Sequence, residues 1–155
     1  MTTLLHKSVQ THINEILPKL ISIRHDIHAH PELGYSEYRT SEVIQGFLQS
    51  NNVAFKSGLA KGTGVLGHLP GQSNKSIALR ADIDALPITE ENTFDWKSVH
   101  EGCMHACGHD GHTTILLGTA LVLSRIAQEH ELPNHVTFVF QPAEEGGGGG
   151  EQMVL

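Results

Sequence analysis

Apolar residues in the first fifty positions recur with helical spacing. Residues 8–29 carry them every three or four positions, which predicts a helix that Pro18 kinks or splits. We expect this helix to end before Pro31, because the residue that precedes a proline avoids the α conformation. Ser36 is expected to open a second helix, which should end at the two asparagines of residues 51 and 52.

The spacing then changes to that of strands. Three short apolar segments predict three strands, the second one rich in glycine: residues 53–56, 62–69 and 76–82. A helix that is apolar nearly all round is expected next, capped by Asp110 or Thr113 and buried in the fold. Residues 135–140 form a continuous apolar segment, which is typical of a central parallel strand covered on both faces.

This order of elements predicts an α/β sandwich. Residues 88–106 interrupt the pattern and are expected to form a long irregular loop anchored by Phe94 and Trp96. Loops of that length are usually functional or disordered, and the chemistry at the end of this one favours function. No Gly-x-Gly-x-x-Gly motif follows a predicted strand, and no Gly-x-x-x-x-Gly-Lys-Ser/Thr motif occurs, so nucleotide binding has no support.

The composition is that of a globular domain with an acidic surface. The chain has 155 residues, 39% of them hydrophobic, which is enough for one domain with a core. Its formal net charge of -7 disfavours nucleic acid and anionic membranes as partners. No segment has the length of a membrane span, and the first residues lack the apolar core of a signal peptide, so we expect a cytoplasmic location.

The densest chemistry lies at residues 100–112, where four histidines, two cysteines, a glutamate and an aspartate alternate with glycines. Thiolate and imidazole are among the best ligands for transition metals. A disulfide between Cys103 and Cys107 would close a trivial loop, so a thiolate ligand is the better use of one of them. A thiol redox protein is a competing interpretation, which the Cys-x-x-x-Cys spacing disfavours because the usual redox motif is Cys-x-x-Cys.

Two of the predicted strands end in paired acids. Asp82 and Asp84 follow one strand, and Glu144 and Glu145 follow another. Each pair alone has an ordinary explanation as a surface pair or a turn former. However, sites in open α/β sheets gather beyond the carboxyl ends of the strands, so we expect the acids and the Cys/His segment to meet there. The five glycines after Glu145 fit either a flexible linker or a close backbone approach to a site.

Together these residues are the parts of a metal-dependent hydrolase. A mixed set of sulfur, nitrogen and oxygen donors suits zinc, and manganese, cobalt and nickel are further candidates. Glu145 would add a carboxylate ligand, and Glu144 is the natural general base for a water whose pKa the metal lowers. The predicted reaction is hydrolysis of an amide, in which Glu144 takes a proton from water and returns it to the leaving amine.

Four segments together resemble the aminoacylase/hippurate hydrolase family of metal-dependent amidohydrolases, in the branch with plant auxin-conjugate hydrolases and bacterial N-acyl-amino-acid deacetylases. The segments are RHDIHAHPELG at residues 24–34, LRADIDALP at 79–87, MHACGHDGH at 104–112 and QPAEEG at 141–146. The resemblance implies a zinc-peptidase-like α/β fold, with a mixed, largely parallel sheet between helices, which this chain contains only in part.

The resemblance also assigns roles to single residues. Cys107, His109 and Glu145 are the implied metal ligands, in a site that holds two divalent ions when complete, manganese or zinc. Glu144 and Asp84 are the implied catalytic residues, Glu144 as the base and Asp84 as the carboxylate that orients a ligand.

Other residues of the four segments receive weaker expectations. Asp82 stands where related branches have a ligand histidine, and His112 is expected to be a cap or a support for a ligand. The remaining residues are expected to be polar loop residues, namely His100, Cys103 and His105, or structural ones, namely His28, His30 and Glu32.

Members of that family are more than twice as long as this chain. Residues 1–155 are therefore expected to be the amino-terminal part of the catalytic domain, with the lid and dimerisation domain absent and further metal ligands beyond residue 155. The implied substrate is a small N-acyl amino acid, and the implied partner is a second copy, as in full-length members, or a complementary chain. The alternative is an inactive fragment that binds metal.

Overall fold

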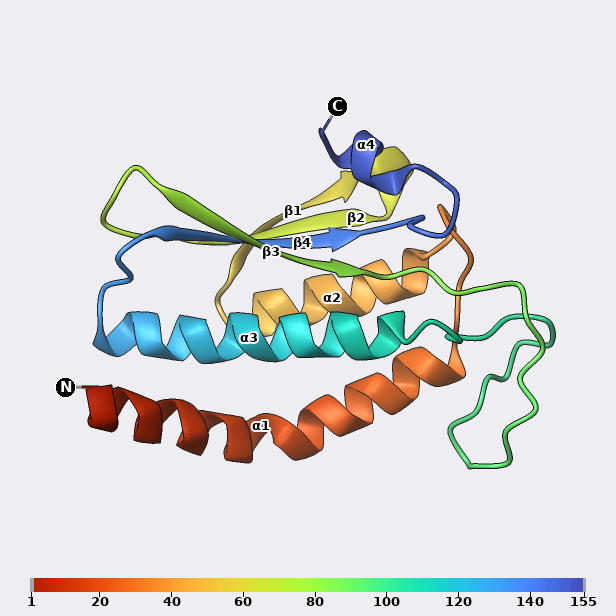
Figure 1. The fold of residues 1–155 in the computed structure, drawn as a ribbon, viewed down its shortest axis with the longest axis horizontal. Helices are drawn as coiled ribbons and strands as arrows, with labels where there is room; N and C mark the ends of the chain where they lie inside the picture. The colour runs from red at the N-terminus through yellow and green to blue at the C-terminus, as the bar shows by residue number, and fades with distance from the viewer. Residues whose placement is uncertain (1, 155) are drawn as a thin grey trace.

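The computed structural model describes residues 2–154, which form a layer of helices packed against a four-stranded sheet (Figure 1). The elements in chain order are α1 (Thr2–Ala29), α2 (Tyr38–Ser50), β1 (Ala54–Leu59), the short 3-10 helix η1 (Ala60–Gly62), β2 (Gly64–Leu69), β3 (Ser76–Asp82), α3 (His109–Glu129), β4 (His135–Gln141) and α4 (Gly149–Val154). All of the predicted helices and strands are therefore present, β3 with the predicted ends and the others with shifted ends.

The first two helices begin at other residues than predicted. α1 starts before the predicted residue 8 and runs without a break through Pro18, although its ribbon bends along its length (Figure 1). α2 begins at Tyr38 rather than at the predicted Ser36. The reason is that the Glu32 carboxylate accepts hydrogen bonds from the N–H groups of Arg39 and Thr40, so a residue outside the helix satisfies its first turn.

The sheet has the strand order β1-β2-β4-β3. β1 pairs with β2 and β2 pairs with β4 in antiparallel fashion, and β3 and β4 alone among these strands are parallel. The expectation of a mixed α/β sheet is confirmed, but the expectation that the sheet is largely parallel is wrong. The link between β1 and β2 is only the short η1, and parallel neighbours need a longer crossover such as the one that α3 provides between β3 and β4.

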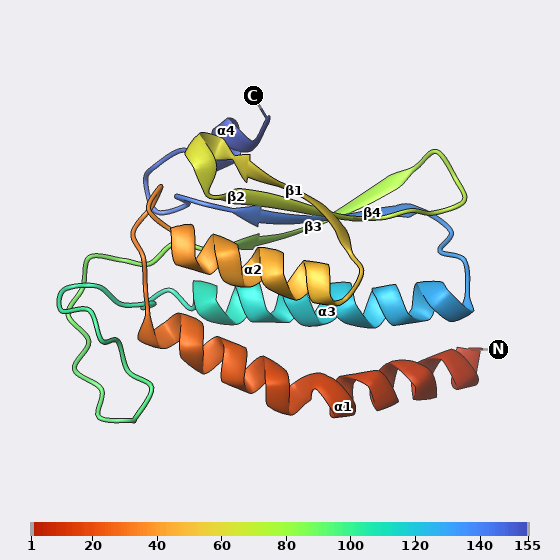
Figure 2. The same ribbon diagram turned by 180° about the vertical axis from the view of Figure 1, so that it is seen from behind.

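The three long helices lie on one face of the sheet, with α2 and α3 next to it and α1 outside α3 (Figures 1 and 2). Burial along β4 alternates, so Phe138 and Phe140 are fully buried against the helices while Val139 is half-buried on the other face. The expected sheet between helices is present in part, because only the short α4 lies on the side opposite the long helices, and β4 is not fully covered on that face (Figure 1). The core lies between the sheet and α2 and α3.

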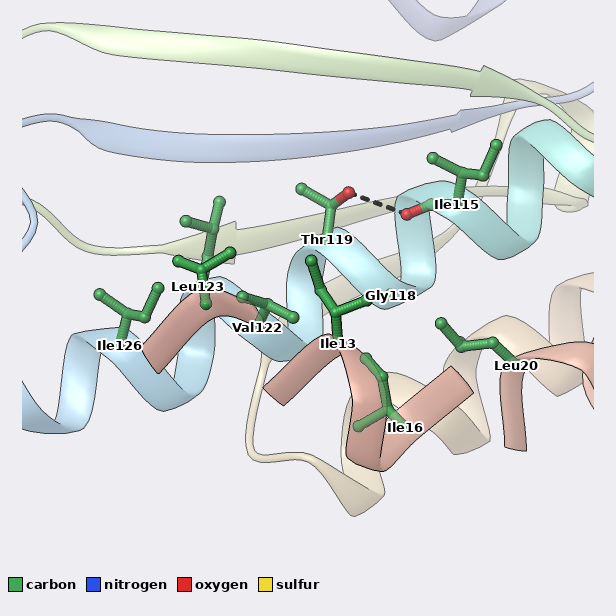
Figure 3. Close-up of a pocket in the computed structure, with 10 residues that line it drawn as sticks. Ile13, Ile16, Leu20, Ile115, Gly118, Thr119, Val122, Leu123 and Ile126 are labelled. Carbon is green, nitrogen blue, oxygen red and sulfur yellow. Dashed lines mark hydrogen bonds between the residues drawn. The ribbon is translucent and has the colours of Figure 1, made fainter. Parts of the chain in front are cut away.

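An apolar groove of about 380 Å³ lies between α1 and α3 (Figure 3). The helices approach closely there because Gly118 has no side chain, and a Cβ at that position would lie 2.7 Å from Leu20 Cδ1. The lining is aliphatic, including Ile13, Ile16 and Val122, and it contains none of the candidate metal ligands. Of the helices within residues 2–154, none combines the length and apolarity needed to cross a bilayer.

Candidate metal centre

The parallel pairing of β3 and β4 brings the two acidic turns to the same edge of the sheet. The two strands are in register from Ser76 opposite His135 to Asp82 opposite Gln141, so both chains leave the sheet side by side. α3 begins at His109 against this edge, earlier than the predicted caps, which places Asp110 in its first turn. The three groups of candidate ligands therefore meet, as the positions of the strand ends predict.

His109 is buried, and one of its two ring nitrogens is already used. Its Nδ1 lies 2.8 Å from the Asp84 backbone oxygen and 3.2 Å from Asp84 Oδ1. Since a backbone oxygen only accepts, Nδ1 carries the proton and Nε2 is left with a free lone pair. That Nε2 lies 3.6 Å from Asp82 Oδ2, 3.9 Å from Glu144 Oε2 and 4.0 Å from Glu145 Oε1.

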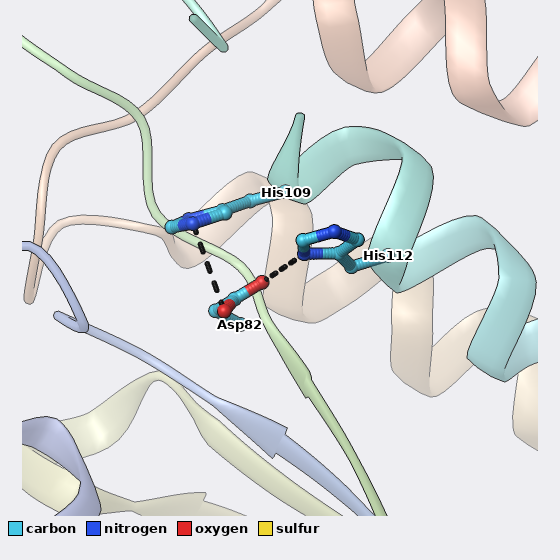
Figure 4. A group of neighbouring side chains, drawn as sticks. All are labelled: Asp82, His109 and His112. Atoms are coloured by element: carbon cyan, nitrogen blue, oxygen red, sulfur yellow. Dashed lines mark hydrogen bonds and ion pairs between the residues drawn. The ribbon is translucent and has the colours of Figure 1, made fainter. Parts of the chain in front are cut away.

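Two sets of donors could hold a metal ion around this nitrogen. One set is Cys107, His109 and Glu145, and the other is Asp82, His109 and His112, each with its donor atoms within 4.8 Å of one another (Figure 4). Both sets use His109, which offers only Nε2. A single imidazole nitrogen binds one ion, so a second ion would be held by the remaining donors.

Asp82 and His112 form a close pair. His112 Nδ1 lies 2.7 Å from Asp82 Oδ1, and the His112 ring stacks on that of His109 (Figure 4). The backbone oxygen of Asp82 accepts a hydrogen bond from Thr113 Oγ1 at 3.0 Å. His112 thus contacts a candidate ligand rather than only starting the helix, and its predicted role as a support fits this contact.

Asp84 connects two of the ligand-bearing segments. It is buried, one carboxylate oxygen lies beside His109 Nδ1, and the other accepts a hydrogen bond from the Glu145 backbone N–H at 3.0 Å. This geometry suits the predicted role of orienting a ligand. Glu144 and Glu145 keep their own side chains partly exposed, at 41% and 30%, so solvent reaches both carboxylates.

The chemistry of the donors fits a divalent transition metal. Four carboxylates surround one imidazole, and the main cation beside them is Arg80, whose Nη1 lies 3.4 Å from Asp82 Oδ2. The hydrogen bond that the exposed Cys107 thiol donates to Glu145, a slight loss of hydration and the surrounding carboxylates raise the pKa of that thiol. A divalent cation would offset this concentration of negative charge and accept sulfur, nitrogen and oxygen donors together.

Two residues expected to be polar loop residues are in fact buried. The Cys103 thiol lies 3.5 Å from the Pro31 backbone oxygen, while His100 is exposed as expected. His105 is buried, with both ring nitrogens unpaired among residues 2–154. Burial lowers the pKa of His105 to about 4, although the charge of Asp110 opposes the shift. The prediction failed because alternating polar and small residues do not show which side of a loop faces inward.

His28 belongs to a buried polar cluster that anchors the long loop. Its Nδ1 lies 3.0 Å from Asp110 Oδ2, and its Nε2 lies 3.1 Å from Glu90 Oε1 in the loop. The structural role expected for His28 agrees with these contacts. The loop is anchored as predicted by Phe94 and Trp96, whose rings stack 3.7 Å apart, with Trp96 stacked on His25 of α1.

Sequence reasoning singled out neither Glu90 nor Glu37. Glu90 bonds to His28 and the Ser98 N–H within the loop, and Glu37 is fully buried against the turn that carries Glu144. A pairing over 106 residues leaves no local pattern that could have revealed it.

Known proteins share both the sequence and the fold of this chain. Residues 78–155 match the model of peptidase family M20/M25/M40. A probable hydrolase of Synechocystis sp. is 47% identical over 141 residues, which are 90% of this chain and 35% of that protein. The chain thus spans about a third of the length of the curated relatives it matches.

Two solved structures superpose on most of the chain. One is the Bacillus subtilis YXEP protein, described as a dinuclear metal-binding peptidase of the M20 family, with a TM-score of 0.84 and 39% identity over 91% of this chain and 39% of that chain. The other comes from methicillin-resistant Staphylococcus aureus, with a TM-score of 0.87 and 34% identity over 96% of this chain and 38% of that chain. By its sequence and its fold, the chain belongs to peptidase family M20/M25/M40.

Proposed function

We propose that this chain supplies the metal ligands and the general base of an amidohydrolase that cleaves the amide bond of N-acyl amino acids such as hippurate. One observation carries the proposal: donor atoms of Cys107, His109 and Glu145 lie within 4.8 Å of one another, with Glu144 Oε2 3.9 Å from the same imidazole. The similarity to a dinuclear metal-binding peptidase supports two divalent ions, manganese or zinc, in the complete site.

Each side chain has a defined task in this proposal. Cys107, His109 and Glu145 hold a metal ion, and Asp84 holds His109 in the tautomer that presents Nε2. When bound, divalent ions supply Lewis acidity towards the amide carbonyl and lower the pKa of water. Glu144 accepts the proton of the attacking water at its carboxylate and delivers it to the leaving amine nitrogen. Its partly exposed side chain lets water and substrate reach it.

A second candidate is a metal-binding chain that becomes active only with a complementary chain. Two observations favour it: each candidate donor set has three residues, and the chain spans about a third of the length of its relatives. Residues 1–155 would then be the amino-terminal part of the catalytic domain. The same proposal includes a substrate-recognition surface and a partner, which is a second copy or a complementary chain.

The test is to purify this chain, supply manganese or zinc, and measure bound metal per chain and hippurate hydrolysis. We expect stoichiometric metal in the original chain and in Glu144→Gln, with hydrolysis abolished in the variant. Glu151→Gln, a matching change at an exposed glutamate of α4, should alter neither.

The outcomes separate the candidates. Metal binding with hydrolysis supports the enzyme, and metal binding without hydrolysis supports the chain that needs a partner. A chain that binds no metal contradicts both, and hydrolysis that persists in Glu144→Gln removes Glu144 from the role of base.

A further inference from the structure

The turn after β4 carries both glutamates in a backbone conformation that needs external support. Ala143, directly before Glu144, has a φ of 49°, which lies in the left-handed region that a residue with a side chain rarely adopts. Ala143 is also buried. Strained residues of this kind persist only where the surrounding structure holds them, and they concentrate at functional sites.

Glu37 provides that support from the start of α2. Its carboxylate is fully buried, with Oε1 accepting the Ala143 N–H at 2.8 Å and Oε2 accepting the Thr63 hydroxyl at 2.8 Å. Glu37 occupies the N-cap position of α2, but its side chain makes no capping hydrogen bond to that helix. The capping task falls to Glu32, so the Glu37 carboxylate serves the distant turn instead.

The two N–H groups that flank Glu144 are therefore both held by buried carboxylates. Glu37 holds the N–H of Ala143, and Asp84 holds the N–H of Glu145 at 3.0 Å. Packing fixes the same turn from outside, because a Cβ on Gly149 would lie 1.6 Å from the Pro142 backbone oxygen. Glu37 thus fixes the peptide plane before Ala143, the Gly149 N–H fixes the next plane through the Ala143 oxygen at 3.1 Å, and Asp84 fixes the plane after Glu144. Together these bonds set the directions in which Glu144 and Glu145 leave the backbone.

We infer that Glu37 is a positioning residue, which aims Glu144 and Glu145 at the metal centre through the Ala143 N–H. This inference rests on the proposed function of those two glutamates. In this inference the Glu37 side chain matters because it is long enough to accept a hydrogen bond from the Ala143 N–H. Two substitutions separate the effect of side-chain length from that of charge. Glu37→Gln keeps the length of the side chain and removes its charge, whereas Glu37→Asp keeps the charge and shortens the side chain by one methylene.

The experiment compares Glu37→Gln and Glu37→Asp in this chain, with Glu32→Asp as the matched control. Glu32 lies in the same region and makes three hydrogen bonds to α2, but its side chain does not bond to the turn. Two quantities are measured: hydrogen exchange at the Ala143 amide by NMR, and the affinity for Co²⁺ from its visible absorption. Thermal unfolding monitors the general loss of stability in each variant.

Positioning predicts that Glu37→Asp raises Ala143 exchange and lowers Co²⁺ affinity by about 10- to 100-fold, the range seen when supports of metal ligands are removed. Glu37→Gln should stay within about threefold of the original chain in both quantities. Glu32→Asp should lower the melting temperature without changing either quantity.

Two results would overturn the inference. One is Ala143 exchange in Glu37→Asp that equals the exchange in Glu32→Asp, which would mean that Glu37 is only structural. The other is a loss of Co²⁺ affinity in Glu37→Gln with Ala143 still protected, which would mean that charge matters and position does not. If the original chain binds no Co²⁺, the proposed function fails, and Ala143 exchange alone still decides whether Glu37 holds the turn.

Discussion

The substitution Asp84→Asn tests how the metal centre is held together. Both neighbours of the Asp84 carboxylate are hydrogen-bond donors: His109 Nδ1 at 3.2 Å from Oδ1, and the Glu145 N–H at 3.0 Å from Oδ2. An asparagine has one oxygen and one NH₂ group, so one of these donors would face another donor. His109 keeps the Asp84 backbone oxygen at 2.8 Å, so the imidazole should retain its tautomer.

The size of the effect follows from this count. One hydrogen bond to a charged acceptor is lost and the other becomes neutral, which costs roughly 1.5–3 kcal/mol in a buried place. At about 1.4 kcal/mol per factor of ten, this corresponds to a loss of roughly 10- to 100-fold in metal affinity. The substitution should change the tautomer of His109 little, because the Asp84 backbone oxygen still orients the imidazole ring.

The assay is a Co²⁺ titration followed by visible absorption, with thermal unfolding in parallel. Asp26→Asn is the control for the change in net charge, because Asp26 is a partly exposed partner of Arg39 and makes no contact with the centre. Asp84→Asn should weaken Co²⁺ binding at least tenfold more than Asp26→Asn does. Equal affinities in the two variants would refute the role of Asp84 in holding His109 and Glu145.

Further changes test other parts of the description. Cys107→Ala should abolish the sulfur-to-cobalt absorption band and lower metal content, and unchanged absorption would exclude Cys107 as a ligand. Burial raises the pKa of Glu37 above 4.5, so its ionisation costs stability as pH rises from 4.5 towards the folded pKa, and Glu37→Gln should gain relative stability over that interval. Although burial opposes the shift, the Ser98 N–H and the other donors to Glu90 lower its pKa. The stability that Glu90→Gln removes at neutral pH should therefore shrink as pH falls below 4.5. Urea unfolding at pH values on both sides of 4.5 measures both slopes, and equal signs would contradict the assignment. Gly149→Ala should displace the turn and lower the melting temperature, because its Cβ would overlap the Pro142 oxygen, and an unchanged melting curve would show that the turn has room to relax.

The sequence predicted most elements because the strongest signals are local. The apolar spacing located every long helix and the four strands, and the acids at the ends of β3 and β4 pointed to one edge of the sheet. The expectation of a largely parallel sheet was wrong at β1 and β2, since apolar content does not distinguish parallel from antiparallel neighbours. The short link between them carried that information, because a crossover does not fit in it.

The candidate site was predicted in part for the same reason. Cys107 and His109 lie close together in the sequence, and paired acids are visible at once. What the sequence could not show are long-range contacts, such as that between Glu37 and Ala143, and the burial of His105 inside a polar segment. Those depend on which face of a loop turns inward, and the packing of distant elements decides it.

The parallel register of β3 and β4 makes metal uptake a measure of folding. A slip of one residue would turn Asp82 to the opposite face of the sheet, and a slip of two would move it by about 6.6 Å relative to β4, beyond the reach of a shared ion. Donors from three distant parts of the chain therefore meet only after this non-local pairing has formed in its single correct register. Pairings between residues far apart in the sequence form slowly during folding. The colour of bound Co²⁺ during refolding would consequently record the moment at which the two strands align.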